Sequence, residues 1–92
     1  MRPNIKNNYA KLYEVLLQLK SEEDCKNLMN DLCTERELNA MTQRIMAAKM
    51  LLSGATYESV IKETNVSSAT LSRVSRCVKN GKGYKKFIDI SK

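Results

Sequence analysis

With 92 residues, the chain is long enough for one small-cored domain, and we expect residues 1–92 to form it. The chain has no histidine, and its three cysteines lack C-x-x-C spacing, which argues against a zinc site and a disulfide framework. The net charge of +6 is uneven: residues 1–61 carry eight basic and eight acidic side chains, whereas residues 62–92 carry eight basic against two acidic, the pattern of a polyanion-binding surface.

One proline and three glycines leave long stretches uninterrupted, so the sequence predicts an all-α, multi-helical fold. A first helix is expected over residues 8–20. Its apolar stripe, typical of a core-facing helix, consists of Leu12, Val15, Leu16 and Leu19. Ser21 is expected to cap a second helix that has three acids in its first turn. The inner face of that helix consists of Cys25, Leu28, Met29 and Leu32.

A third helix, the longest, is expected to begin at Thr34, where Thr-Glu-Arg-Glu forms a capping box in which Glu37 accepts from the amide of Thr34. Its apolar residues alternate spacings of three and four, the period of a seam against other helices. The seam consists of Leu38, Met41, Ile45, Ala48 and Leu52, flanked by Met50 and Leu51. Gly54 is expected to end the helix.

Residues 56–74, TYESVIKETNVSSATLSRV, have the spacing of a helix-turn-helix, with helices expected near residues 57–64 and 67–79. Asn65 occupies the turn, where the backbone must be left-handed, and Ser67 follows as an N-cap. Ile61 is expected where the two helices touch most closely. The residues expected to face inward are Val60, Thr64, Val66, Leu71, Val74 and Val78.

The opposite side of the second of these helices is rich in hydroxyls and is expected to face the major groove of double-stranded DNA. The residues on this side are Ser67, Ser68, Ala69, Ser72, Arg73 and Arg76. Such short side chains predict reading through bridging water and DNA shape, while Arg73, Arg76 and Lys79 supply salt-sensitive affinity.

After a break at Gly81-Lys-Gly83, a short basic amphipathic helix is expected to dock on the core. Its apolar residues are Tyr84, Phe87, Ile88 and Ile90. The first two helices carry apolar stripes for which the chain offers no further partner, so we expect a homodimer with half-sites roughly 34 Å apart.

The cysteines Cys25, Cys33 and Cys77 are expected to be free thiols acting as small core residues, with redox sensing as the alternative. Together with the absence of a signal peptide or a long apolar run, they indicate a cytoplasmic protein with no membrane partner. No residues suggest acid-base chemistry, a metal or a cofactor, and we expect no enzymatic activity.

Four segments carry a family resemblance: residues 32–37 (LCTERE), 43–44 (QR), 51–54 (LLSG) and 69–73 (ATLSR). In this order they resemble the Trp repressor family, most closely its YerC/YecD-type branch, over roughly residues 10–90. The resemblance implies a DNA-binding transcriptional regulator built as an intertwined homodimer whose first helices interlock. It also implies base-edge positions at Ser68, Ala69 and Ser72, and phosphate neighbours at Lys62, Thr70 and Lys79.

The resemblance further implies a ligand pocket containing Thr34, Arg44 and Arg73, the positions that hold tryptophan in the tryptophan-binding repressor. This chain has Val74 where that repressor has a glycine and Cys77 where it has a serine. A branched side chain should fill part of the pocket, so we expect no tryptophan corepressor. Arg73 then has a role at DNA, and Arg44 is open to an ion pair with a neighbouring helix.

Three hypotheses follow. The leading one is a sequence-specific regulator, a repressor, that acts as a homodimer without an obligatory ligand. The second is a protein-interaction module that uses the same scaffold to bind an acidic protein surface. The third is a sensor of an amino-acid-like small molecule, with a reshaped pocket between Arg44 and Arg73.

Overall fold

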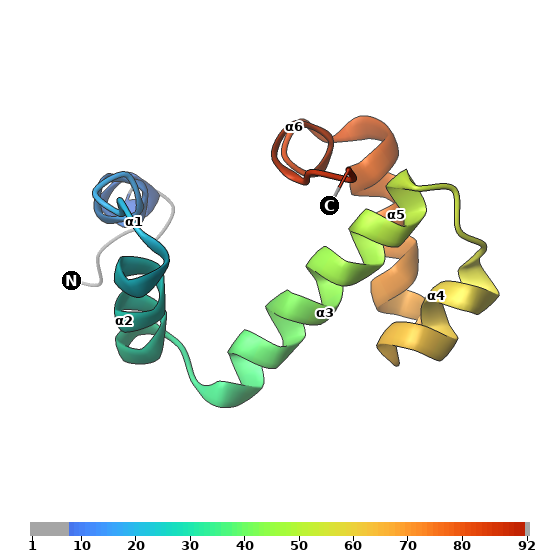
Figure 1. Ribbon diagram of the computed structural model, residues 1–92, viewed down its shortest axis with the longest axis horizontal. Helices are drawn as coiled ribbons and strands as arrows, with labels where there is room; N and C mark the ends of the chain where they lie inside the picture. Colours follow the sequence, from blue (N-terminus) through green and yellow to red (C-terminus); the bar gives the residue numbers. More distant parts are fainter. Residues whose placement is uncertain (1–7, 92) are drawn as a thin grey trace. The chain divides into compact units, whose positions relative to one another are not determined.

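The computed structural model describes residues 8–91, which form six helices and no strand (Figure 1). The all-helical prediction is confirmed. The chain divides between Thr34 and Glu35 into two compact units. Unit 1 contains α1 (Tyr9–Leu16) and α2 (Glu22–Leu32), and unit 2 contains α3 (Glu35–Leu52), α4 (Tyr57–Thr64), α5 (Ser68–Asn80) and α6 (Tyr84–Phe87).

In unit 1 the first helix is shorter than predicted, because it ends at Leu16 instead of running to residue 20. The backbone tightens there, with the amides of Gln18 and Leu19 donating to carbonyls three residues earlier. The next amide, that of Lys20, donates to the Asp24 carboxylate at 3.1 Å. The Lys20 amide is thus bonded at the start of the second helix, whereas a first helix that reached residue 20 would need it for a bond within that helix.

The start of α2 agrees with the prediction. Ser21 has an extended backbone, and its Oγ accepts from the amide of Asp24 at 3.0 Å. Glu22, Glu23 and Asp24 occupy the first turn, where negative charge offsets the helix dipole.

Neither helix of unit 1 has a buried residue. The stripe on α1 was predicted to face a core, yet Leu12 and Val15 are exposed, and so is Leu32 on α2. Cys25 is exposed as well, so its interpretation as a small core residue is wrong, whereas Cys33 and Cys77 are half-buried free thiols. Much of the apolar surface among the described residues of unit 1 is therefore exposed.

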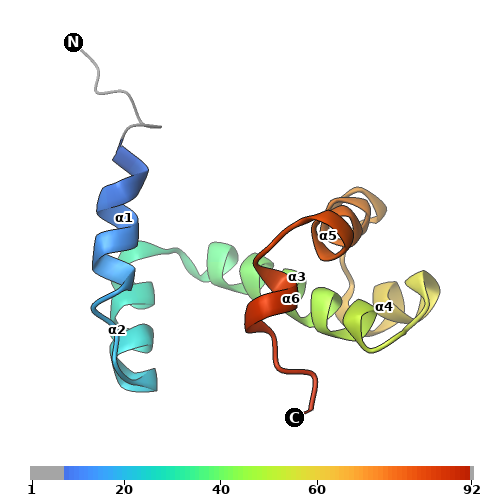
Figure 2. The same cartoon turned by 90° about the horizontal axis from the view of Figure 1, so that it is seen from above.

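Unit 2 has its core where the C-terminal half of α3 meets the helix-turn-helix. Figures 1 and 2 show α4 and α5 beside that half of α3, and α6 also contacts α3 and α5. The buried apolar residues are Ala47, Ala48, Val60, Val66, Leu71 and Val74. Two consecutive alanines on α3 leave room for two helices to approach it closely.

The end of α3 follows its sequence signals. The helix stops at Leu52, and Gly54 adopts φ +91°, a left-handed conformation that glycine reaches without a Cβ penalty. Part of the predicted seam differs, because Ile45 is exposed instead of buried. In unit 2, Ile45 lies on the side of α3 that lines an open groove between α3, α5 and α6.

Candidate nucleic-acid interface

The turn of the helix-turn-helix has the predicted geometry. Asn65 has φ 61° and ψ 22° and is the only non-glycine residue with positive φ among residues 8–91. Its amide donates to the carbonyl of Ile61 at 2.8 Å, which closes α4. Beside it, the buried Thr64 donates its hydroxyl to the carbonyl of Val60 at 2.7 Å and accepts from the amide of Val66. These bonds satisfy the polar groups that the turn buries.

The recognition helix α5 begins at the predicted cap. Ser67 has an extended backbone, and its Oγ accepts from the amide of Thr70 at 3.1 Å. The same hydroxyl lies 3.0 Å from the Thr70 hydroxyl, to which it donates. Side chains of the first turn thus cap the helix themselves.

The inward and outward sides of α5 are those that the sequence predicts, with one exception in the motif. Leu71 and Val74 are each 1% exposed, and Val78 is half-buried against the core. All the residues expected to face DNA are exposed to solvent, namely Ser67, Ser68, Ala69, Ser72, Arg73 and Arg76. The exception is Ile61 on α4, expected where the two helices touch most closely, because 37% of this residue is exposed.

The residues expected beside phosphates are also accessible. Lys62 on α4 and Lys79 near the end of α5 are exposed, and Thr70 is half-buried. The ammonium of Lys85 donates to the carbonyl of Lys79 at 3.0 Å, which places a positive charge at the negative end of the α5 dipole. The outer side of the helix-turn-helix thus combines short hydroxyl side chains with flexible cations.

Sequence analysis missed one polar contact inside the motif. The Tyr57 hydroxyl at the start of α4 is hydrogen-bonded to the Oγ of Ser75, a buried residue on α5. The position of Ser75, one turn after Leu71 on the inward side, could have indicated its burial. No local pattern could have named its partner, which lies 18 residues away.

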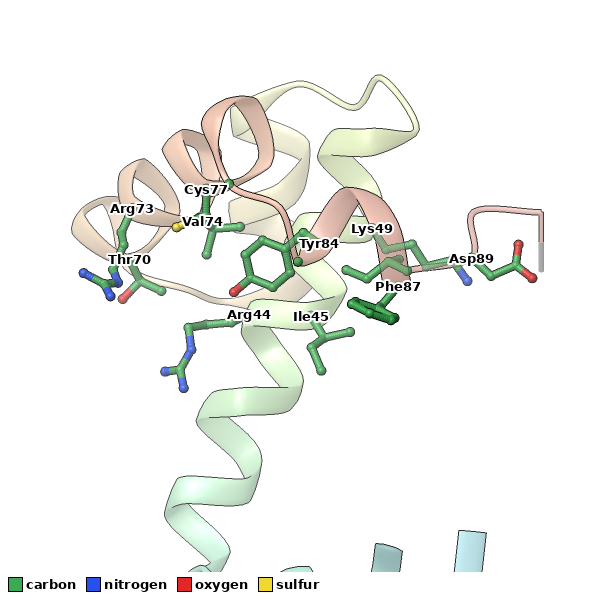
Figure 3. Close-up of a pocket in the computed structure, with 13 residues that line it drawn as sticks. Arg44, Ile45, Lys49, Thr70, Arg73, Val74, Cys77, Tyr84, Phe87 and Asp89 are labelled. Atoms are coloured by element: carbon green, nitrogen blue, oxygen red, sulfur yellow. The ribbon is translucent and has the colours of Figure 1, made fainter. Parts of the chain in front are cut away.

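A groove of about 1110 Å³ opens between α3, α5 and α6 (Figure 3). It brings together Arg44, Arg73, Val74 and Cys77, four of the five predicted pocket residues. The fifth, Thr34, belongs to unit 1, so its place in the pocket stays a prediction.

An aromatic side chain of the chain itself extends into this groove. Figure 3 shows the ring of Tyr84 between Val74 and Cys77 on one side and Arg44 and Ile45 on the other. Tyr84 is half-buried and packs on the core, so α6 docks as predicted. Docking is partial, because Ile88, like Tyr84, packs against the core, whereas Phe87 remains 77% exposed and Ile90 is also exposed.

The groove is electropositive, since Arg44, Lys49 and Arg73 line it with Asp89 as its one acid. The side-chain and backbone hydrogen bonds from Ser91 hold the pKa of Asp89 below its usual value, aided by the charge of Lys49 and opposed by desolvation. Asp89 is therefore ionised at neutral pH, and the groove retains a positive balance.

Among residues 8–91 there is no group of three or more histidine, cysteine or acidic side chains arranged to hold a metal ion. Within the same range, none of the helices is both long enough and apolar enough to cross a membrane.

The sequence pattern of the Trp repressor protein family matches residues 7–91. The chain belongs to the Trp repressor family. The uncharacterized protein YerC of Bacillus subtilis strain 168 is 43% identical to it over 70 residues, which cover 76% of this chain and 67% of YerC. The resemblance drawn from the sequence motifs is thereby confirmed.

Two solved structures of the Trp repressor type share the fold. A candidate Trp repressor from Staphylococcus aureus has a TM-score of 0.80 and 34% identity, over 87% of this chain and 81% of its own. A TrpR-like protein from Eubacterium eligens has a TM-score of 0.81 and 33% identity, over 90% of both chains. Family and fold together indicate a DNA-binding regulator.

Proposed function

We propose that this Trp repressor family member is a sequence-specific transcriptional repressor that binds double-stranded DNA as a homodimer in the cytoplasm, without an obligatory small-molecule effector. The observation that carries the proposal is the outward side of α5. Its serines, its alanine and its two arginines are exposed, while Leu71 and Val74 on the opposite side anchor the helix to α3.

The chemistry of that side suits DNA. Hydroxyl groups donate or accept at base edges, and the methyl group of Ala69 can meet a thymine methyl. Arg73, Arg76 and Lys79 add charges that attract phosphates and release counterions, so binding should weaken steeply with added salt.

The proposed homodimer is supported by unit 1. Exposed apolar residues lie along α1, Leu32 on α2 is exposed too, and no residue of either helix is buried. A second copy offers the same apolar stripes, so two chains can bury them against each other. Two reading heads on one body also multiply the weak affinity of each half-site.

Independence from an effector is supported by the groove. Val74 is fully buried at its wall, and the ring of Tyr84 already lies between α3 and α5. Contacts that a planar ligand would make with both helices are made in part by the chain itself. The side chain of Tyr84 thus supports the recognition helix in place of a ligand.

The test is a titration of genomic DNA fragments followed by sequencing of those retained. We expect inverted repeats among the retained fragments, and tighter binding at low salt. Arg73→Ala and Arg76→Ala should each weaken binding, whereas Arg36→Ala, which removes a likewise exposed charge from the start of α3, should not. Unchanged affinity in both α5 variants at low salt would refute the assigned reading face.

The cationic groove favours a second candidate, a regulator that responds to an amino-acid-like or other anionic aromatic ligand held between Arg44 and Arg73. A ligand that raises the melting temperature and the DNA affinity together would support it. Failure to bind any duplex, even at low ionic strength, would instead favour a protein-interaction module.

A further inference from the structure

Ser75 is a polar residue on the inward side of α5, which is otherwise apolar. It follows Leu71 by one turn on the inward side and is only 5% exposed. A buried hydroxyl without a partner would destabilise the fold, because it loses its hydrogen bonds to water. The partner of Ser75 is the Tyr57 hydroxyl, and no buried side-chain polar atom within residues 8–91 is left unsatisfied.

Tyr57 is itself well placed to hold the position of α4. It is the first residue of that helix, directly after the N-cap Thr56, whose Oγ1 accepts from the amide of Ser59. Its side chain is 47% exposed, so the bond to Ser75 lies where the motif meets solvent. The contact joins the start of α4 to the middle of α5.

Besides the apolar core that they share with α3, the two helices of the motif are therefore joined by two hydrogen-bonded contacts. At the C-terminal end of α4, the turn through Asn65 links the helices and is closed by its own hydrogen bonds. At the N-terminal end, the bond between Tyr57 and Ser75 is the second link. Directional hydrogen bonds at both ends of α4 define its crossing angle with α5 more sharply than apolar packing alone would.

We propose that the Tyr57–Ser75 hydrogen bond fixes the crossing angle of α4 and α5 and thereby determines how well the protein discriminates its operator from other DNA. This inference rests on the proposed DNA-binding function. Ser75 is buried and cannot reach a base, so both partners are positioning residues. The chemistry of the contact is a hydroxyl pair, which a single oxygen deletion removes with little change of shape.

Discrimination should depend on this angle more than overall affinity does. Ser68, Ala69 and Ser72 have short side chains, so a small tilt of α5 takes them out of reach of base edges. Lys62, Arg73 and Lys79 have long flexible side chains that can follow the phosphates after the same tilt. Loss of the Tyr57–Ser75 hydrogen bond should reduce binding to the operator and leave binding to unrelated duplex almost unchanged.

The test compares Tyr57→Phe with the wild-type chain on the selected operator and on unrelated duplex of equal length. We expect operator affinity to fall about fivefold, which corresponds to about 1 kcal/mol if the bond's whole contribution goes into holding α5 at the binding angle, and affinity for unrelated DNA to change less than twofold. Ser53→Ala is the matched control, because it removes one exposed hydroxyl, which donates to the carbonyl of Lys49 outside the helix-turn-helix. It should change neither affinity.

Stability separates positioning from a merely structural role. Tyr57→Phe should lower the melting temperature by leaving the buried Ser75 hydroxyl unpaired. The double variant Tyr57→Phe/Ser75→Ala has no unpaired hydroxyl, so its melting temperature should recover while its operator selectivity stays low. Recovery of both properties together would overturn the positioning role.

A readout without DNA distinguishes failure of this inference from failure of the proposed function. Amide hydrogen exchange in α4 of Tyr57→Phe should accelerate relative to exchange in α3. An unchanged exchange rate in α4 would show that the Tyr57–Ser75 hydrogen bond does not hold this helix. If the wild-type chain shows no operator selectivity, the proposed function is wrong. If the wild type is selective and Tyr57→Phe is equally selective, only the role of the Tyr57–Ser75 hydrogen bond is wrong.

Discussion

Gly81, at the link between α5 and α6, is a position where one added methyl group should have a measurable cost. Its amide donates to the carbonyl of Cys77 at 2.8 Å, and this bond closes α5. A Cβ at position 81 would lie 2.6 Å from that carbonyl oxygen, where ordinary contacts begin near 3.4 Å. The obstacle is backbone, so the change Gly81→Ala must stretch the hydrogen bond or displace α6.

The expected cost follows from this overlap. Forcing one extra methyl group into a packed region destabilises by about 1–3 kcal/mol. Replacing glycine by alanine also restricts the unfolded chain, which offsets about 0.4–1 kcal/mol. We therefore expect a net loss of about 1–2 kcal/mol for Gly81→Ala, and for a domain of this size each kcal/mol lowers the melting temperature by about 4–8 °C.

Gly83→Ala is the matched control, two residues away in the same link. Gly83 has φ −88° and ψ −58°, a helical backbone open to any residue, and an added Cβ there would meet nothing within 4 Å. In thermal denaturation at equal protein concentrations, the melting temperature of Gly83→Ala should equal or slightly exceed that of the wild type. A Gly81→Ala melting curve that coincides with that of Gly83→Ala would refute the reasoning.

Three further predictions concern the motif and the groove. Because Asn65 is left-handed, Asn65→Ala should lower the free energy of unfolding by about 1–2 kcal/mol while Asn65→Gly stays near the wild type in denaturant titrations. Ser67→Ala should lower it by about 1 kcal/mol through loss of the N-cap and Ser68→Ala by much less, and equal losses would contradict the capping role. Tyr84→Ala should weaken operator binding by opening the space between α3 and α5, and p-cresol should partly restore it in a mobility-shift assay, whereas full affinity without the additive would argue against internal bracing.

Sequence analysis predicted the helix-turn-helix well because its determinants are local. Five inward positions, the left-handed Asn65 and the cap at Ser67 are set by spacing and backbone preference within about 20 residues. The end of α3 near Gly54 follows for the same reason. A short segment with consistent signals leaves few alternative structures.

Sequence analysis failed where the outcome depends on distant or absent neighbours. The first helix ends at Leu16, since the Lys20 amide bonds to the cap of the next helix. Ile45 has the spacing of a buried helix residue, yet it is exposed. The spacing of apolar residues does not reveal which part of a long helix is covered by the rest of the chain. Cys25 and the stripe on α1 are exposed for the same reason, because the sequence pattern marks an apolar side without naming its partner.

The candidate site was predictable as a set of residues but not as an arrangement. The outward side of α5 and four groove residues were identified from motif positions. The insertion of Tyr84 into the groove depends on how the Gly81–Gly83 link folds, and the contact between Tyr57 and Ser75 depends on the crossing of two helices. Both are set by packing in three dimensions.

The central claim, that α5 enters the major groove, is tested most directly by methylation protection on the selected operator. The N7 of guanine is reachable only from the major groove, so its protection reports what occupies that groove. We predict two protected clusters roughly 34 Å apart, one for each recognition helix, which disappear with Arg73→Ala at moderate salt. Tight binding that leaves every guanine N7 open to methylation would contradict the account.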